Sequence, residues 1–552
     1  MRSGQRIAVT AGVCAAVVSV VGFGAYSLLG GDDDEGTANV ASTSDSTPSG
    51  TPTEEPEPVT DEEVLAASAA FFDAWTLGDT ATAAGLTDDP QSARVVLDAL
   101  AERAGLAGLA LEPSAPDGAT VPFAVSATVS LDDDEVEPAP WEYTSALEVV
   151  RERGTGEAVV AWDPAVIHPA LDDDQLIEAG PVDELPPVEV LDVNGDVLTA
   201  EDHPSLTPIL ADLRERYGDA SGGTAGGELR IVDAEGETVE RLLELAEPAP
   251  GQVPTTIDPV LQAAAEESVA ARGNASVVAV QPSTGAIQAV ANAPADGMNT
   301  AFEGSYAPGS TFKIVTASLL IDRGLASANA AHPCPKYFEH GGWRFQNLDE
   351  FEIEGGTFAD SFAASCNTAF ISQAPELADD DLGNQARDVF GLGLTWSIGT
   401  TSMDGTVPTQ SDAQMAASLI GQGGVRMNPL NMASVSATVQ SGVFRQPYLV
   451  PPSFDNRALA QAPRGLSGST AQELRSLMNR TAVNGSAAEA LAGLGGDIGG
   501  KTGSAEVDGQ DLPNAWFTAY RNDLAVAALV PESGHGGTNA GPVVAEVLRA
   551  RG

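Results

Sequence analysis

The hydrophobic and polar residues change pattern several times along the chain, and the first change marks an apolar run. Residues 7–29 carry no charge, and 23 residues of helix can cross a hydrocarbon core of about 30 Å. Arg2 and Arg6 precede the run, and acidic residues 32–35 follow it. Because basic residues stay on the cytoplasmic side, we expect a tail at 1–6, an uncleaved membrane anchor at 7–29 and everything later outside the cell. A cleaved signal peptide is the alternative, but no Ala-x-Ala site closes the run.

Residues 30–58 are rich in Ser, Thr, Pro, Asp and Glu, and they predict a disordered tether. The pattern then changes to that of a folded domain over residues 59–171. Thr60 and Glu63 form a capping-box pattern at the start of a helix. Its apolar face is expected to contain Val64, Leu65, Phe71, Phe72 and Trp75. Strand-like runs follow at residues 121–130, 141–150 and 157–162, so this domain is expected to be a small α+β fold.

Residues 172–252 are acidic and rich in Pro and Gly, with short strand signals and one helical pattern at 206–217. They predict a linker or pedestal with little core of its own. Residues 253–552 mix helices and strands in one larger domain. Its early elements are expected to be a helix around 261–266, two strands at 275–280 and 286–290, and a helix that runs from Ser310 to a glycine stop at Gly324.

Composition narrows the possible functions. The net charge of -53 argues against nucleic acid as a partner, because phosphate binding needs clustered Lys and Arg. The three cysteines are too few for a disulfide scaffold. The five histidines show no metal-ligand spacing, so neither a metal nor another cofactor is expected.

Lysine is rare, and its positions are informative. Of the 26 Lys and Arg residues, only Lys313, Lys336 and Lys501 are lysines. Ser310 and Lys313 are three residues apart, which places them on one face of a helix, within hydrogen-bonding range. A desolvated lysine can lose its proton and act as a base, whereas arginine cannot. The pair therefore indicates a serine nucleophile with a lysine base.

Two later motifs complete a possible site. Ser365 and Asn367 form a Ser-x-Asn motif between helical patterns, and Lys501, Thr502 and Gly503 form Lys-Thr-Gly at the start of a strand-like stretch. Serine-x-x-lysine, Ser-x-Asn and Lys-Thr-Gly in this order are typical of penicillin-binding proteins and serine β-lactamases. The surrounding sequence resembles a penicillin-binding transpeptidase domain from about Val253 to the C-terminus. The segments that carry this resemblance are residues 306–313, 365–370, 420–423, 429–433, 499–506 and 515–517.

The resemblance implies acyl transfer through a serine ester. Ser310 would attack a D-Ala-D-Ala stem peptide, Lys313 would be the base, Ser365 would relay a proton and Asn367 would hold Lys313. Lys501 would supply positive charge and, with Thr502 and Gly503, would bind the terminal carboxylate. The backbone N–H groups of Ser310 and Ser504 would form the oxyanion hole. A second stem-peptide amine would then accept the acyl group, and β-lactams would acylate Ser310 and leave slowly.

The segment 59–171 resembles the NTF2-like spacer domain of the low-affinity, MecA-type penicillin-binding proteins. The resemblance rests on residues 71–79 and 161–171. The expected fold class is therefore a multidomain chain. It has one N-terminal transmembrane helix, an NTF2-like α+β domain, a pedestal and a C-terminal α/β transpeptidase domain like the serine β-lactamases. Such a class B protein implies the cytoplasmic membrane, and possible pairing with a polytopic membrane glycosyltransferase.

Other readings remain open at this point. A D,D-carboxypeptidase uses the same residues with water as the acceptor, and a β-lactam sensor would retain only the binding. A class A β-lactamase needs a glutamate for deacylation, and residues 376–379 lack the expected Glu-x-x-Leu-Asn pattern. A bifunctional synthase needs a glycosyltransferase domain, for which residues 59–171 are too few.

Cys334 and Cys366 both lie on the extracellular side of the predicted anchor, where disulfides persist. The hypothesis is that they form a bridge that ties the preceding loop to the Ser365–Asn367 turn. The alternative is a buried free thiol beside Ser365.

Overall fold

The computed structural model describes residues 57–132, 136–182 and 185–551. The predicted cytoplasmic tail (1–6), membrane anchor (7–29) and nearly all of the tether (30–58) lie outside the described residues. Within the described part, no helix has the length and apolar character that crossing a bilayer requires.

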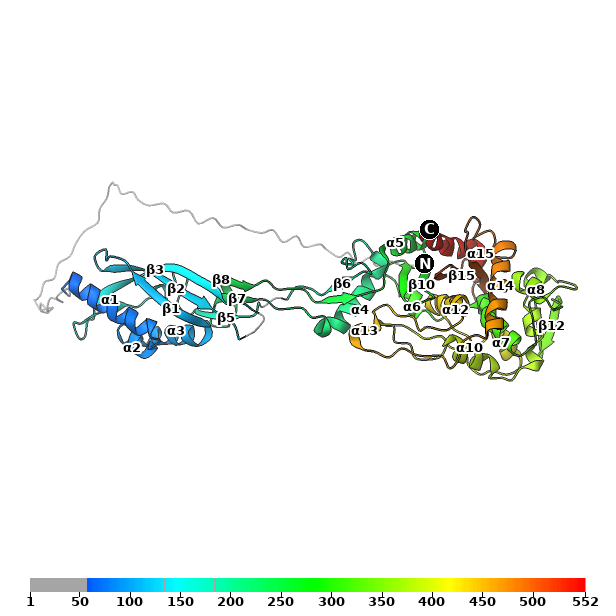
Figure 1. The fold of residues 1–552 in the computed structure, drawn as a ribbon, viewed down its shortest axis with the longest axis horizontal. Helices are drawn as coiled ribbons and strands as arrows, with labels where there is room; N and C mark the ends of the chain where they lie inside the picture. The colour runs from blue at the N-terminus through cyan, green and yellow to red at the C-terminus, as the bar shows by residue number, and fades with distance from the viewer. Residues whose placement is uncertain (1–56, 133–135, 183–184, 552) are drawn as a thin grey trace, which may run out of the picture. The chain divides into compact units, whose positions relative to one another are not determined.

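The first folded domain contains three helices and a four-stranded antiparallel sheet of order β1-β2-β3-β4 (Figure 1). The Thr60 hydroxyl accepts from Glu63 N, and the Glu63 carboxylate accepts from Thr60 N, so the predicted capping box is confirmed. The α+β prediction is also confirmed, although the sequence pattern did not reveal α2, α3 or β1. The elements are α1 (Asp61–Thr76), α2 (Thr80–Gly85), α3 (Pro90–Arg103), β1 (Leu106–Pro113), β2 (Thr120–Val129), β3 (Ala139–Arg151) and β4 (Ala158–Ala161).

The core of this domain forms where α1 packs on the sheet. Phe71, Phe72 and Trp75 of α1 are buried, and Phe72 meets Phe123 of β2 with ring centroids 4.8 Å apart. The prediction for Leu65 was wrong, since 54% of this side chain is exposed. Leu65 precedes the buried Phe72 by seven residues, so the two lie on nearly the same side of α1. Leu65 is exposed because the core on that side does not extend to the first turn of the helix.

Residues 172–252 contain more structure than the sequence pattern predicted. A three-stranded sheet of order β5-β7-β8 packs its buried residues Ile177, Leu229 and Ile231 into the core of the first domain. β6 and α4, which lie between β5 and β7 in the sequence, pack into the core of the C-terminal domain through Val190, Leu210 and Leu213. The buried residues of this segment therefore belong to the cores of the two domains on either side of it. Its elements are β5 (Leu176–Gly180), β6 (Glu189–Leu191), α4 (Thr207–Tyr217), β7 (Gly227–Val232), β8 (Thr238–Ala246) and β9 (Gln252–Pro254).

A five-stranded antiparallel sheet of order β11-β10-β16-β15-β14 organises the C-terminal domain (Figure 1). Because side chains alternate along a strand, the sheet contributes to a separate core on each face. One core includes α5 and α16, and the other includes α7 and α12. The strands are β10 (Ala275–Val280), β11 (Ile287–Ala293), β14 (Ile498–Ala505), β15 (Asn514–Arg521) and β16 (Leu524–Val530).

Helices and one small hairpin, β12 (Tyr337–His340) and β13 (Trp343–Gln346), complete this domain. Asn428 caps α12 with its side chain, and Pro429 occupies the first helical turn, where the missing N–H has no consequence. The helices are α5 (Pro259–Ala270), α6 (Thr300–Glu303), α7 (Lys313–Asp322), α8 (Phe358–Ala363), α9 (Thr368–Ile371), α10 (Asp381–Phe390), α11 (Asp412–Ser418), α12 (Pro429–Ser441), α13 (Pro452–Asp455), α14 (Gly468–Asn484), α15 (Gly536–Asn539) and α16 (Gly541–Ala550).

A matched pair of substitutions on α1 tests this packing. Phe71→Ala is expected to lower the opening free energy of the first domain by about 3–5 kcal/mol, because it leaves a cavity in the core. Leu65→Ala is expected to change it by less than about 0.5 kcal/mol, since this side chain is mostly in water. Native-state hydrogen exchange of the amides in α1–α3 and β1–β4 measures both effects without assuming that the whole chain unfolds in one step. Equal effects of the two substitutions would contradict the assignment of the core.

Candidate active site

Ser310 lies where the chain enters the central helix of the C-terminal domain. A short 3₁₀ turn, η4 (Gly309–Phe312), contains Ser310 and leads directly into α7, whose first residue is Lys313. The two side chains therefore meet across the junction of the two helix types, and Lys313 Nζ lies 3.0 Å from Ser310 Oγ. The expected hydrogen-bonding distance between the pair is found.

The turn between α8 and α9 brings the Ser-x-Asn motif to Lys313. Lys313 Nζ donates to the Ser365 carbonyl oxygen at 2.8 Å and to Asn367 Oδ1 at 2.7 Å. It also lies 3.5 Å from Ser365 Oγ. Ser365 has a φ of 59°, in the left-handed region that side-chain-bearing residues rarely occupy. Such a conformation persists only where neighbouring contacts hold it.

Strand β14 carries the third motif, which lies within the strand rather than at its start. Lys501 Nζ donates to Ser365 Oγ at 2.8 Å and to the Thr502 carbonyl oxygen at 3.0 Å. Ser365 thus links the two lysines, since its carbonyl oxygen contacts one amine and its hydroxyl contacts the other. The hydroxyl of Thr502 pairs with that of Ser486 at 2.7 Å.

Two glycines allow β14 to lie directly against the turn that holds Ser310. Gly309 has a φ of 53°, and a Cβ there would lie 2.9 Å from the Ser504 carbonyl oxygen. A Cβ on Gly503 would lie 2.9 Å from the Pro308 carbonyl oxygen and 3.1 Å from Thr311 N. Because these approaches exclude any side chain, glycine at both positions sets the spacing between Ser310 and the edge of the sheet.

Both lysines of the site are buried, and burial disfavours their charged forms. Desolvation holds the pKa of Lys313 well below its usual value, and the nearby positive charge of Lys501 lowers it further. Desolvation lowers the pKa of Lys501 to about 7. The rings of Phe370 and Phe362 lie near the Lys313 and Lys501 amines, with centroids 5.5 and 5.7 Å away. Burial therefore favours the neutral amine form of Lys313, which can accept the Ser310 proton.

Cys334 and Cys366 are joined by a disulfide in the structure. Cys366 is the middle residue of the Ser-x-Asn motif, and Cys334 belongs to the loop that precedes β12. The bridge therefore ties the turn that carries Ser365 and Asn367 to that loop, as the hypothesis states.

Several contributors to the site were missed in the sequence. Asn347 is buried and binds the backbone after Ser365, and Ser486 contacts Thr502. Gly421 accepts a hydrogen bond from Gly309 N through its carbonyl oxygen. Gly421 lies in segment 420–423, which supported the family resemblance. The sequence therefore pointed to this segment but not to the hydrogen bond that makes it part of the site. A single Asn or Ser in a polar loop carries no comparable signal.

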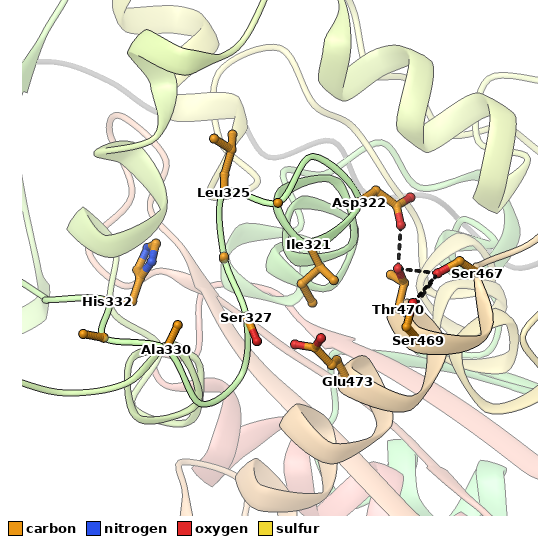
Figure 2. A pocket seen from close by; sticks show the side chains of 13 residues that line it. Ile321, Asp322, Leu325, Ser327, Ala330, His332, Ser467, Ser469, Thr470 and Glu473 are labelled. Atoms are coloured by element: carbon orange, nitrogen blue, oxygen red, sulfur yellow. Dashed lines mark hydrogen bonds between the residues drawn. The ribbon is translucent and has the colours of Figure 1, made fainter.

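A separate cavity of about 480 Å³ lies near the other end of α7 (Figure 2). Figure 2 shows Asp322 bonded to Thr470 at one side of it, with Glu473 and Ser327 below α7. Both acids have partners, because Asp322 also contacts Gln385 and Arg464, and Glu473 accepts from Ala328 N. The Ser310, Lys313 and Lys501 side chains do not line this cavity.

Comparison with protein families assigns both folded domains. Residues 275–549 match the penicillin-binding protein transpeptidase domain, and residues 64–175 match the NTF2-like N-terminal transpeptidase domain. The chain is 30% identical over 360 residues to the peptidoglycan D,D-transpeptidase PbpA of Mycolicibacterium smegmatis. This alignment covers 54% of the present chain and 72% of the relative.

Two solved structures share the fold. One is penicillin-binding protein 2 of Pseudomonas aeruginosa in complex with WCK 5153, with a TM-score of 0.52 and 22% identity over 67% of this chain and 97% of the other. The second comes from a peptidoglycan synthase complex described as coordinating polymerization and crosslinking. It has a TM-score of 0.55 and 21% identity over 70% of this chain and 93% of the other.

The electrostatic description can be tested with nuclear magnetic resonance, because the chain has only three lysines. In protein labelled with ¹³C at lysine Cε, the Lys501 signal is expected to titrate with a midpoint near pH 7, and the Lys313 signal well below its usual value. Lys501→Met is expected to raise the Lys313 midpoint, since a neighbouring like charge is removed.

Lys336 is the internal control of this titration. It is exposed to water and bonded to Glu350, which raises its pKa, so its midpoint should stay above those of the other two lysines in both proteins. A Lys313 midpoint that stays fixed or falls in Lys501→Met would show that the two amines are not coupled as described.

Proposed function

The chain belongs to the class B penicillin-binding proteins, the peptidoglycan D,D-transpeptidases, and we propose that its acyl-enzyme forms on Ser310. The observation that carries the proposal is the contact between Ser310 Oγ and Lys313 Nζ at 3.0 Å, with Lys313 buried. A buried amine with a lowered pKa, next to a serine hydroxyl, is the arrangement that serine activation by lysine requires.

In the acylation step, neutral Lys313 takes the proton of Ser310 as Oγ attacks the carbonyl carbon between the two D-alanines of a stem peptide. The bond to the terminal D-alanine breaks, and its nitrogen needs a proton. Ser365 is suited to deliver this proton, because its hydroxyl accepts from Lys501 Nζ at 2.8 Å and lies 3.5 Å from Lys313 Nζ. A serine ester of the donor peptide and free D-alanine result.

The edge of the sheet supplies the binding groups in this proposal. β14 pairs with β15 on one side, and no strand in the described part of the chain pairs with its other side. Apart from the carbonyl oxygens of Ile498 and Thr502, which accept from Asn479 and Lys501, the backbone groups on that side are proposed to bind an extended peptide. The N–H groups of Ser310 and Ser504 are proposed to stabilise the oxyanion, supported by the close approach of Gly309 to the Ser504 backbone. Thr502, Gly503 and Lys501 are proposed to bind the terminal carboxylate.

In the second step, the amine of another stem peptide attacks the ester carbonyl, and Ser310 Oγ takes back a proton. The cross-link forms, and the enzyme returns to its starting state. A β-lactam would acylate Ser310 by the same first step. Its leaving amine remains attached in the opened ring, which accounts for slow release.

The location and the partners are also proposed. The uncharged run at residues 7–29, with arginines before it and acids after it, favours a single-pass anchor in the cytoplasmic membrane. The two matched domains account for cross-linking and spacing. Glycan polymerisation would then fall to a polytopic membrane glycosyltransferase as a partner.

The first functional prediction concerns labelling with a fluorescent penicillin. The full chain is expected to be labelled covalently and to lose the label slowly, and Ser310→Ala should show no covalent label because the attacking oxygen is gone. Ser318→Ala is the matched control, since Ser318 is a buried serine on the same helix whose hydroxyl donates to Val315 O. Its labelling should match that of the wild type. Covalent labelling of Ser310→Ala would show that Ser310 is not the nucleophile.

The second prediction concerns the acceptor. With a synthetic stem pentapeptide and a D-amino acid in excess, the protein is expected to release D-alanine and to form the exchanged peptide as the main product. Mass spectrometry separates this product from the hydrolysed tetrapeptide. Ser310→Ala should form neither. Hydrolysis as the dominant reaction at every acceptor concentration would instead favour a D,D-carboxypeptidase.

A further inference from the structure

Asn347 lies at the centre of the polar contacts behind the Ser365–Asn367 turn. It follows β13 directly and is 1% exposed. Its Oδ1 accepts from the backbone N–H of Asn367 at 2.8 Å and from that of Thr368 at 3.1 Å. Its Nδ2 donates to the carbonyl oxygens of Phe351 at 2.8 Å and Pro335 at 3.0 Å. The Asn347 side chain therefore connects the segments before β12 and after β13 to the Ser365–Asn367 turn.

The neighbouring residue determines the orientation of the Asn367 side chain. Asn367 Nδ2 donates to the carbonyl oxygen of Gln346 at 3.1 Å. Because the nitrogen of that amide is used there, its oxygen faces Lys313 Nζ, which lies 2.7 Å away. Gln346 and Asn347 together thus bind Asn367 through its side chain and its backbone.

The turn needs such support, because its conformation is strained. Ser365 has a φ of 59°, a conformation that a non-glycine residue adopts only at a cost in free energy. The Cys334–Cys366 disulfide holds the turn at its middle residue. Asn347 holds the two residues that follow, and it also donates to the Cys334 sulfur at 3.2 Å.

We propose that Asn347 is a positioning residue for acyl transfer, which fixes the Ser365–Asn367 turn so that Asn367 Oδ1 meets Lys313 Nζ. It touches neither Ser310 nor Lys313 through any contact found in the described residues. It acts through Asn367, and its loss leaves the nucleophile, the base and the carboxylate-binding groups in place. This inference rests on the proposed role of Ser310.

A positioning role for Asn347 predicts different effects on β-lactam binding and on the acylation rate constant. The groups proposed to bind the β-lactam carboxylate lie on β14, so removal of the Asn347 amide should leave the dissociation constant of the first complex nearly unchanged. The acylation rate constant at saturating β-lactam should fall, because small displacements of a catalytic group reduce rates strongly. A purely structural residue would lower the thermal midpoint without this split.

The test uses the full chain, non-reducing buffer and a fluorescent penicillin at several concentrations. Asn347→Ala is expected to slow acylation at saturation by about tenfold or more, with the dissociation constant within twofold of the wild-type value. If the alanine variant does not fold, Asn347→Ser makes the same comparison with a residue that can hold a water.

Asn292 supplies the matched control. Like Asn347, it is a buried asparagine whose side-chain amide both donates and accepts hydrogen bonds. Its Nδ2 donates to Asn299 Oδ1 at 3.0 Å, and its Oδ1 accepts from Ala301 N at 2.9 Å. Asn292→Ala should lower the thermal midpoint but keep the acylation rate constant within twofold of wild type.

Two results would overturn the inference: wild-type acylation in Asn347→Ala, or equal slowing in Asn292→Ala. A wild-type protein that fails to bind the penicillin covalently would overturn the proposed function instead, so the two failures are distinguishable.

Discussion

The burial of two lysine amines in one small site is the constraint on which the rest of the structure depends. An isolated buried ammonium costs several kcal/mol, and two neighbouring ones also repel each other. Burial lowers the pKa of both Lys313 and Lys501, so the site favours the uncharged amines and reduces this cost. The same pressure that disfavours the proton on Lys313 makes it a base for Ser310. Stability and reactivity are therefore opposed here, and the fold must supply enough contacts to keep both amines in place.

Those contacts come from segments far apart in the sequence. Ser310 and Lys313 belong to the start of α7, Ser365 and Asn367 to the turn before α9, and Lys501 to the edge strand β14. Each segment is held by a different device. Helical geometry positions Ser310 and Lys313. The Cys334–Cys366 disulfide and the buried Asn347 amide hold the Ser365–Asn367 turn. Close backbone approaches that only glycine allows set the third. None of these devices uses a side chain that reacts, so the framework and the reactive groups can vary separately.

The sequence predicted the motifs well because their physics is local or compositional. A serine and a lysine three residues apart meet on almost any helix. Lysine is rare in this chain, and two of its three lysines, Lys313 and Lys501, lie in the motifs. The capping box at Thr60 was readable for the same reason. The pairing of Asn347 with Asn367 was not readable, because it depends on how a hairpin folds back over the turn. Leu65 was predicted to be buried because it lies on nearly the same side of α1 as Phe72, but the core does not cover that side in the first turn of the helix.

The segment 172–252 shows where composition and packing disagree. Its Pro, Gly and acid content suggests a linker, yet its buried residues belong to two cores. Ile177 and Leu229 pack with the first domain, whereas Leu210 and Leu213 pack with the domain that carries Ser310. α4 and β6 therefore cover apolar surface that a domain starting at residue 253 would leave in water. Since apolar burial is the main favourable term in folding, the physical unit that supports the site begins before the change in composition at residue 253.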